Sequence, residues 1–137
     1  MEERINDKII EIEKYLEQLE SVLPISFEDY KNNWKIKDIC ERHFEKIIEA
    51  IEDLAFLVVN YKELKYPEYE KEIFDTLYQE KIISEELSKK LKDAKGMRNF
   101  IIHQYGNIND ELVFEAVTEQ LEKDVSEFLN AIEKAIK

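Results

Sequence analysis

The chain has 137 residues, 44% of them hydrophobic and 38% charged, which suits one folded domain over residues 1–137. It contains only two glycines and two prolines, which excludes the frequent turns of a sheet protein and favours helices joined by short loops. The net charge of −12 disfavours binding to nucleic acid unless a local basic surface outweighs it.

Other features of the composition concern the cellular compartment. Cys40 is the only cysteine, which excludes an internal disulfide and a cysteine-based metal site, and we interpret it as a small core residue. The first residues carry charges of both signs, and no apolar run reaches the roughly 18–20 residues that span a bilayer. We therefore expect no secretion signal, no membrane segment and a cytoplasmic location.

Apolar residues at alternating steps of three and four predict the first helices. The first of them runs from Ile5 to Leu23 and ends at Pro24. After a connecting segment, a second helix is predicted over residues 36–61. A proline at position 67 disfavours helix just before it, and a short third helix is predicted over residues 69–80.

The last two predicted helices have clear capping signals. Ser84 is a good N-cap for a fourth helix, which ends at Gly106, a natural C-terminal residue. Asn109 or Asp110 caps a fifth helix, whose apolar stripe extends to Ile132. The sequence thus predicts an all-α, up-and-down bundle of about five helices, four long and one short.

The fourth predicted helix carries an arginine where a core residue is expected. Its apolar stripe includes Leu87, Leu91, Ala94 and Ile101, and Arg98 falls on the same stripe. A buried guanidinium costs several kcal/mol unless it is paired or faces a polar cavity, so we expect an ion pair with Glu49 or Asp53 of the second helix. Gly96 costs about 1 kcal/mol relative to alanine in a helix, and such a glycine usually permits the close approach of another backbone or a ligand.

A second, polar stripe of this helix contains His103. Lys92, Gly96, Asn99 and His103 step by four, three and four, and Asn99 could orient the histidine from one turn away. Arg98 and His103 are separated by about 140° around an ideal helix, so one straight helix does not point both at the same bond. Either the helix end distorts near Gly106, or a second copy completes the cluster by two-fold pairing along this stripe.

These residue types suit the cleavage of RNA. His103 is suited to general acid or base work, and Arg98 can stabilise the charge of a phosphorane-like transition state. The 2′-hydroxyl of RNA can be the nucleophile, so no metal is required and none is expected. From Lys81 to Arg98 there are six cations and three anions, a local charge of +3. The other histidine, His43, borders an apolar stripe and is interpreted as a partly buried structural residue.

The segment GMRNFIIHQY resembles a known motif. Arg98, four residues, His103, one residue and Tyr105 resemble the RxxxxHxY motif of HEPN-domain ribonucleases, specifically HepT-like toxins. The likeness extends through IISEELSKKLKDAKGMRNFIIHQYGNIN and to ERHFEKIIEAIEDLA, and so covers most of the chain from about residue 36. Met97 departs from the pattern, since an aromatic residue is common there.

The resemblance implies a function. Such proteins are five-helix bundles that dimerise so that two motifs face each other, and they cut RNA without a metal or cofactor. They are usually paired with a MntA-like minimal nucleotidyltransferase, an antitoxin that transfers AMP from ATP onto the motif tyrosine. Carried over, Arg98 and His103 would be catalytic, Asn99 and Gly96 would support them, and Tyr105 would accept the AMP.

Two other classes of function remain open. The chain could be a non-catalytic helical binding subunit that accompanies a nucleotidyltransferase, a role that suits a charge of −12. Growth arrest on expression of this chain alone would separate the toxin from the binding subunit. A purely structural bundle would leave Arg98 on the core stripe unexplained.

Overall fold

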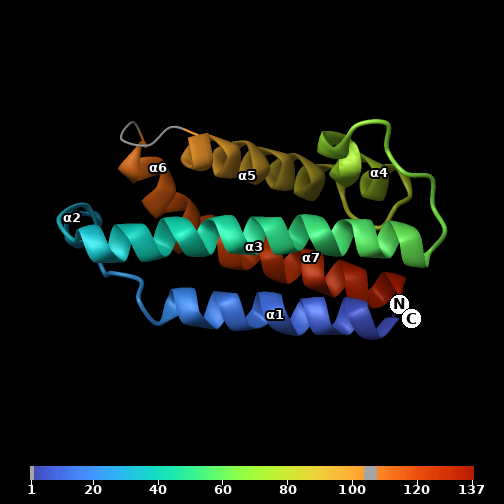
Figure 1. The fold of residues 1–137 in the computed structure, drawn as a ribbon, viewed down its shortest axis with the longest axis horizontal. Coiled ribbons are helices and arrows are strands. Elements are labelled where there is room, and N and C mark those ends of the chain that lie inside the picture. The colour runs from blue at the N-terminus through green and yellow to red at the C-terminus, as the bar shows by residue number, and fades with distance from the viewer. Residues whose placement is uncertain (1, 104–107) are drawn as a thin grey trace.

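The computed structural model describes residues 2–103 and 108–137, and these form an all-helical bundle (Figure 1). The long helices within these residues run up and down and are α1 (Glu2–Glu20), α3 (Trp34–Tyr61), α5 (Glu85–His103) and α7 (Leu121–Ala135). In Figure 1, α3 lies in the middle, with α1 along one side and α5 along the other. The predicted all-α, up-and-down architecture is confirmed.

Shorter elements account for the differences from the predicted boundaries. They are α2 (Phe27–Lys31), a 3₁₀ turn (Glu70–Glu72), α4 (Ile73–Gln79), α6 (Asp110–Glu115) and a π-helical turn (Ala116–Gln120). The predicted fifth helix is therefore divided by the π turn, and the predicted third helix begins as a 3₁₀ turn. Helix α2 lies in the segment that was expected to be only a connection.

Side-chain caps set where several helices begin. Asn33 Oδ1 accepts hydrogen bonds from the amides of Lys35 and Ile36, so α3 begins two residues before the predicted start. Ser84 Oγ accepts from the Leu87 amide at 3.1 Å, which confirms the predicted cap of α5. Between the two predicted caps of the following helix, Asn109 is the one that acts.

The apolar stripes of all four long helices meet in one core. In α1, Ile12 is fully buried, whereas Ile10, two residues earlier on the same helix, is 64% exposed. Replacing Ile12 by alanine is expected to lower the free energy of unfolding by about 2–5 kcal/mol, because it removes packed methyl groups and leaves a cavity. The same change at Ile10 should cost less than about 0.5 kcal/mol. Urea denaturation of both variants checks this contrast, and equal losses would contradict the placement of α1.

Cys40 of α3 has no exposed surface, as expected of a core residue. Burial raises the pKa of its thiol to about 11, since an apolar site disfavours the thiolate, and the nearby Glu41 acts in the same direction. The folded protein is expected to resist alkylation by iodoacetamide at pH 8, and the unfolded protein should react fully. Mass spectrometry with and without denaturant measures both. Rapid labelling of the folded chain would contradict this placement.

His43 joins α3 to α1. Its Nδ1 lies 3.1 Å from the Ile39 carbonyl oxygen, and its Nε2 lies 3.0 Å from the side-chain amide oxygen of Gln18. The residue is partly buried, which confirms its interpretation as structural.

Candidate active site

Helix α5 presents a polar stripe to the outside of the bundle. Its inner side is fixed by the buried residues Leu87, Ser88, Leu91 and Ile101, which face α3, α4 and α7. On the outer side, all four residues of the predicted stripe are exposed, namely Lys92, Gly96, Asn99 and His103. The stripe is therefore a continuous exposed surface of one helix, contacted at its start by Asp75 of α4, which lies 2.9 Å from Lys92.

Arg98 lies on the inner side of the same helix, with only 14% of its side chain exposed. Its Nη1 lies 3.8 Å from Oε1 of Glu52 on α3, and its Nη2 donates a 2.9 Å hydrogen bond to Oδ1 of Asn99. Within the described residues, the buried Nε has no hydrogen-bond partner. The guanidinium is thus held between a carboxylate and an amide.

The predicted ion-pair partners of Arg98 were wrong. Glu49 is exposed, and Asp53 lies 3.7 Å from Lys8 of α1. Because α3 is packed between α1 and α5, residues that follow each other on it face different neighbours. Position 53 turns towards α1 and position 52 towards α5, so Glu52 is the carboxylate that meets Arg98.

Glu52 and Lys95 are the functional candidates that the sequence reasoning missed. Lys95 Nζ forms an ion pair with Oε2 of Glu52 and lies 3.5 Å from the carbonyl oxygen of Glu70. A signal for Glu52 was present, because it follows Ile48 by four residues on a stripe that is otherwise apolar. The reasoning that singled out Arg98 on α5 would also have found this acid on α3.

His103 is the last described residue of α5 and is exposed. Within residues 2–103 and 108–137, no hydrogen bond or ion pair joins it to Arg98, and Asn99 binds the arginine rather than the histidine. The two motif residues therefore occupy separate surroundings in a single chain, as their angular separation predicts. Tyr105 and Gly106 lie outside the described residues.

Gly96 opens onto space. A Cβ atom placed on it would have no neighbour within 4 Å, so none of the described residues makes the close approach that a glycine in a helix suggests. The open space on this side of α5 remains available to another molecule.

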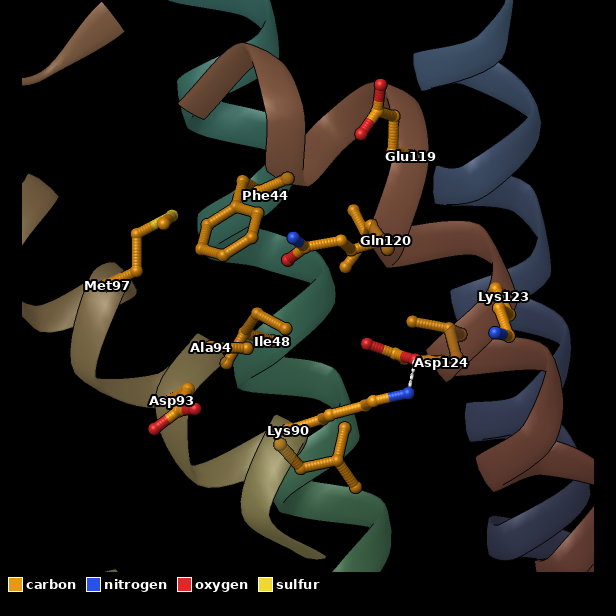
Figure 2. A pocket seen from close by; sticks show the side chains of 14 residues that line it. Phe44, Ile48, Lys90, Asp93, Ala94, Met97, Glu119, Gln120, Lys123 and Asp124 are labelled. Carbon is orange, nitrogen blue, oxygen red and sulfur yellow. Dashed lines mark ion pairs between the residues drawn. The ribbon is translucent and has the colours of Figure 1, made fainter. Parts of the chain in front are cut away.

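A cavity of about 420 Å³ lies on another side of α5, between this helix, α3 and the segment from the π turn into α7 (Figure 2). Phe44, Ile48 and Met97 contribute apolar walls, and Lys90 lies 3.8 Å from Asp124. Burial raises the pKa of Asp124, although the charge of Lys90 opposes this shift. The cavity includes neither Arg98 nor His103, and the sequence did not predict it because it depends on the π turn.

Two further properties of the described residues bear on the class of protein. None of the helices that they form is both long enough and apolar enough to cross a membrane. In the same ranges, no group of three or more His, Cys, Asp or Glu side chains gathers in a way that could hold a metal ion.

The chain is similar to known nucleases. Over 132 residues it is 26% identical to the mRNA nuclease HepT of Shewanella oneidensis, covering 96% of this chain and 98% of that protein. Over 112 residues it is 28% identical to the tRNA nuclease HepT of Aphanizomenon flos-aquae, covering 82% of this chain and 76% of that protein.

A solved structure has the same fold. It is the tri-AMPylated HEPN toxin of Shewanella oneidensis in complex with an MNT antitoxin, with a TM-score of 0.86 and 26% identity over 95% of this chain and 96% of that one. The family model described as Ribonuclease HepT-like matches residues 12–132, a range that includes the whole RxxxxHxY segment. The resemblance read from this segment is confirmed, and the chain belongs to the HepT-like ribonuclease family.

Proposed function

We propose that this chain is a metal-independent RNA endonuclease that acts as the toxin of a toxin–antitoxin pair in the cytoplasm. The proposal rests on one observation: helix α5 carries both a mostly buried arginine with fixed contacts and an exposed histidine. Arg98 is held by Glu52 and Asn99, and His103 is open to solvent on the outer stripe of α5. The proposal is supported by the two similar nucleases and by the similar toxin whose structure was solved with its antitoxin.

The reaction is a transfer within the RNA itself. The 2′-hydroxyl oxygen attacks the neighbouring phosphorus as a base removes its proton, and the bond from phosphorus to the 5′-oxygen breaks as that oxygen takes up a proton. His103 serves as the base or the acid, since an imidazole changes its charge near neutral pH. Arg98 balances the additional negative charge on the phosphorane oxygens.

A second copy of the chain completes the site. Arg98 and His103 lie about 140° apart around α5, so a single helix cannot bring both to one phosphate. Two copies related by two-fold symmetry and paired along this side of α5 would make the two motifs face each other, so that both chains line one cleft. The open space at Gly96 supports this arrangement, because it lets a neighbouring molecule come close to the helix.

Neutralisation is proposed to occur by covalent modification. A MntA-like nucleotidyltransferase would transfer AMP from ATP to the hydroxyl of Tyr105, two residues after His103. The added phosphate carries negative charge next to the site that has to receive the RNA phosphate. The AMPylated relative in its antitoxin complex supports this route.

The alternative is a non-catalytic binding subunit, which the net charge of −12 favours. Expression of the chain without any antitoxin separates the two. We expect growth arrest, and we expect the purified dimer to degrade RNA in excess EDTA. A harmless protein that leaves RNA intact would establish the binding subunit, and loss of activity in EDTA would refute the metal-independent reaction.

A further inference from the structure

The cluster around Arg98 contains more positive than negative charge. Two cations from α5, Lys95 and Arg98, share the single carboxylate of Glu52, and their side chains are only 12% and 14% exposed. The buried Nε of Arg98 adds a donor without an acceptor in the described residues. Burying an excess cation is costly unless an anion accompanies it. The cluster therefore lacks one negative charge, which a phosphodiester group can supply at the exposed edge of Lys95 and Arg98.

Lys95 lies between the two motif residues around the helix. It precedes Arg98 by three positions, which places it about 60° from the arginine on the side towards His103. The remaining separation from Lys95 to His103 is about 80°. Lys95 therefore lies on the side of Arg98 that faces the histidine stripe, where it can meet a phosphate bound at the arginine.

Contacts from two other elements hold Lys95 in place. Glu52 of α3 pairs with it, and the carbonyl oxygen of Glu70, in the 3₁₀ turn before α4, lies 3.5 Å from its Nζ. Glu52 also faces Arg98, so one buried carboxylate aligns both cations. Cations fixed before the substrate arrives stabilise developing charge without having to reorganise.

We propose that Lys95 is an RNA phosphate-binding residue beside Arg98, and that Glu52 is a positioning residue for both cations. This inference rests on the proposed ribonuclease function and extends it to two residues outside the RxxxxHxY motif. Lys95 contacts the substrate. Glu52 acts through Lys95 and Arg98.

The role of Lys95 is tested by RNA binding. Lys95→Gln keeps a donor for Glu52 and leaves Glu52 and Arg98 as a balanced pair, so the fold should persist. Lys134→Gln is the matched control, since Lys134 is exposed near the end of α7 and its replacement changes the net charge equally. The probe is an RNA with 2′-O-methyl groups, which cannot be cleaved, and its fluorescence anisotropy reports Kd.

For Lys95→Gln we expect Kd to rise about tenfold and the slope of log K against log salt to fall by about one. The control should change Kd by less than about twofold. If the two substitutions changed Kd equally, the assignment of Lys95 would be wrong, because the lysine would then contribute only through the net charge of the protein.

The role of Glu52 is tested by separating turnover from binding. Glu52→Gln and the control Glu49→Gln each remove one negative charge, so general attraction for RNA should increase alike in both. Glu52→Gln is expected to lower kcat by about 10–100-fold with Kd no weaker, since the cations lose their alignment. Glu49→Gln should leave kcat unchanged. An unchanged kcat in Glu52→Gln, or a loss that appears only as weaker binding, would overturn the positioning role.

Folding is monitored by circular dichroism, because Glu52→Gln leaves two cations without a carboxylate. If that variant does not fold, Glu52→Gln combined with Lys95→Gln replaces it, and its kcat is compared with that of Lys95→Gln alone. A wild-type protein that cleaves no RNA would refute the proposed function, while the Kd comparison would still decide whether Lys95 binds phosphate. Cleavage by the wild type with no effect of either substitution would refute only the inference on Lys95 and Glu52.

Discussion

Replacement of His103 by alanine is expected to abolish RNA cleavage by the purified protein and growth arrest by the expressed chain. Removal of a general acid or base costs about 10²–10⁴-fold in rate. Because His103 is exposed, its loss should not affect the core. Cleavage of a fluorescent RNA in excess EDTA measures the rate, and circular dichroism verifies the fold.

His43→Gln is the control, since His43 is the only other histidine and contacts α1 through Gln18. It should retain cleavage, with at most a lower thermal midpoint. Cleavage at the wild-type rate by His103→Ala would refute the catalytic assignment, and loss of cleavage in both variants would identify the effect as one on stability.

Replacement of Tyr105 by phenylalanine is expected to make the toxin resistant to its antitoxin. Transfer of AMP requires a phenol oxygen, which attacks the α-phosphorus of ATP and displaces pyrophosphate. Phenylalanine keeps the ring and removes that oxygen. After co-expression with a MntA-like nucleotidyltransferase, the wild-type chain should gain the mass of one or more AMP groups. Tyr105→Phe should gain none and should continue to arrest growth.

Tyr66→Phe is the matched control, because Tyr66 is 54% exposed and lies outside the motif. It should be modified and neutralised like the wild type. AMP on Tyr105→Phe, mapped by peptide mass spectrometry to another residue, would contradict the assignment of the acceptor.

The sequence predicted the long helices well because their signals are local. Apolar stripes and caps such as Ser84 depend on residues within one helix, and α1, α3 and α5 are found close to their predicted positions. The exposed stripe that ends at His103 was predicted for the same reason. Boundaries were less accurate where a cap was overlooked, as at Asn33.

Contacts between helices were harder to predict. The partner of Arg98 depends on how α3 is rotated about its axis between α1 and α5, and one position separates Glu52 from Asp53. Hydrophobic periodicity does not fix this rotation to a single residue. The π turn at Ala116–Gln120 also escaped prediction, since an additional residue in one turn leaves the apolar spacing nearly unchanged.

Both chain ends lie at the end of the bundle away from the His103 end of α5 (Figure 1). A purification tag or fluorescent reporter joined to residue 2 or residue 137 would leave the molecule on the side remote from the histidine. Such a fusion should therefore leave the exposed polar stripe of α5 uncovered near His103. We expect a chain labelled at either end to arrest growth as the unlabelled chain does, so that toxicity can be followed in living cells.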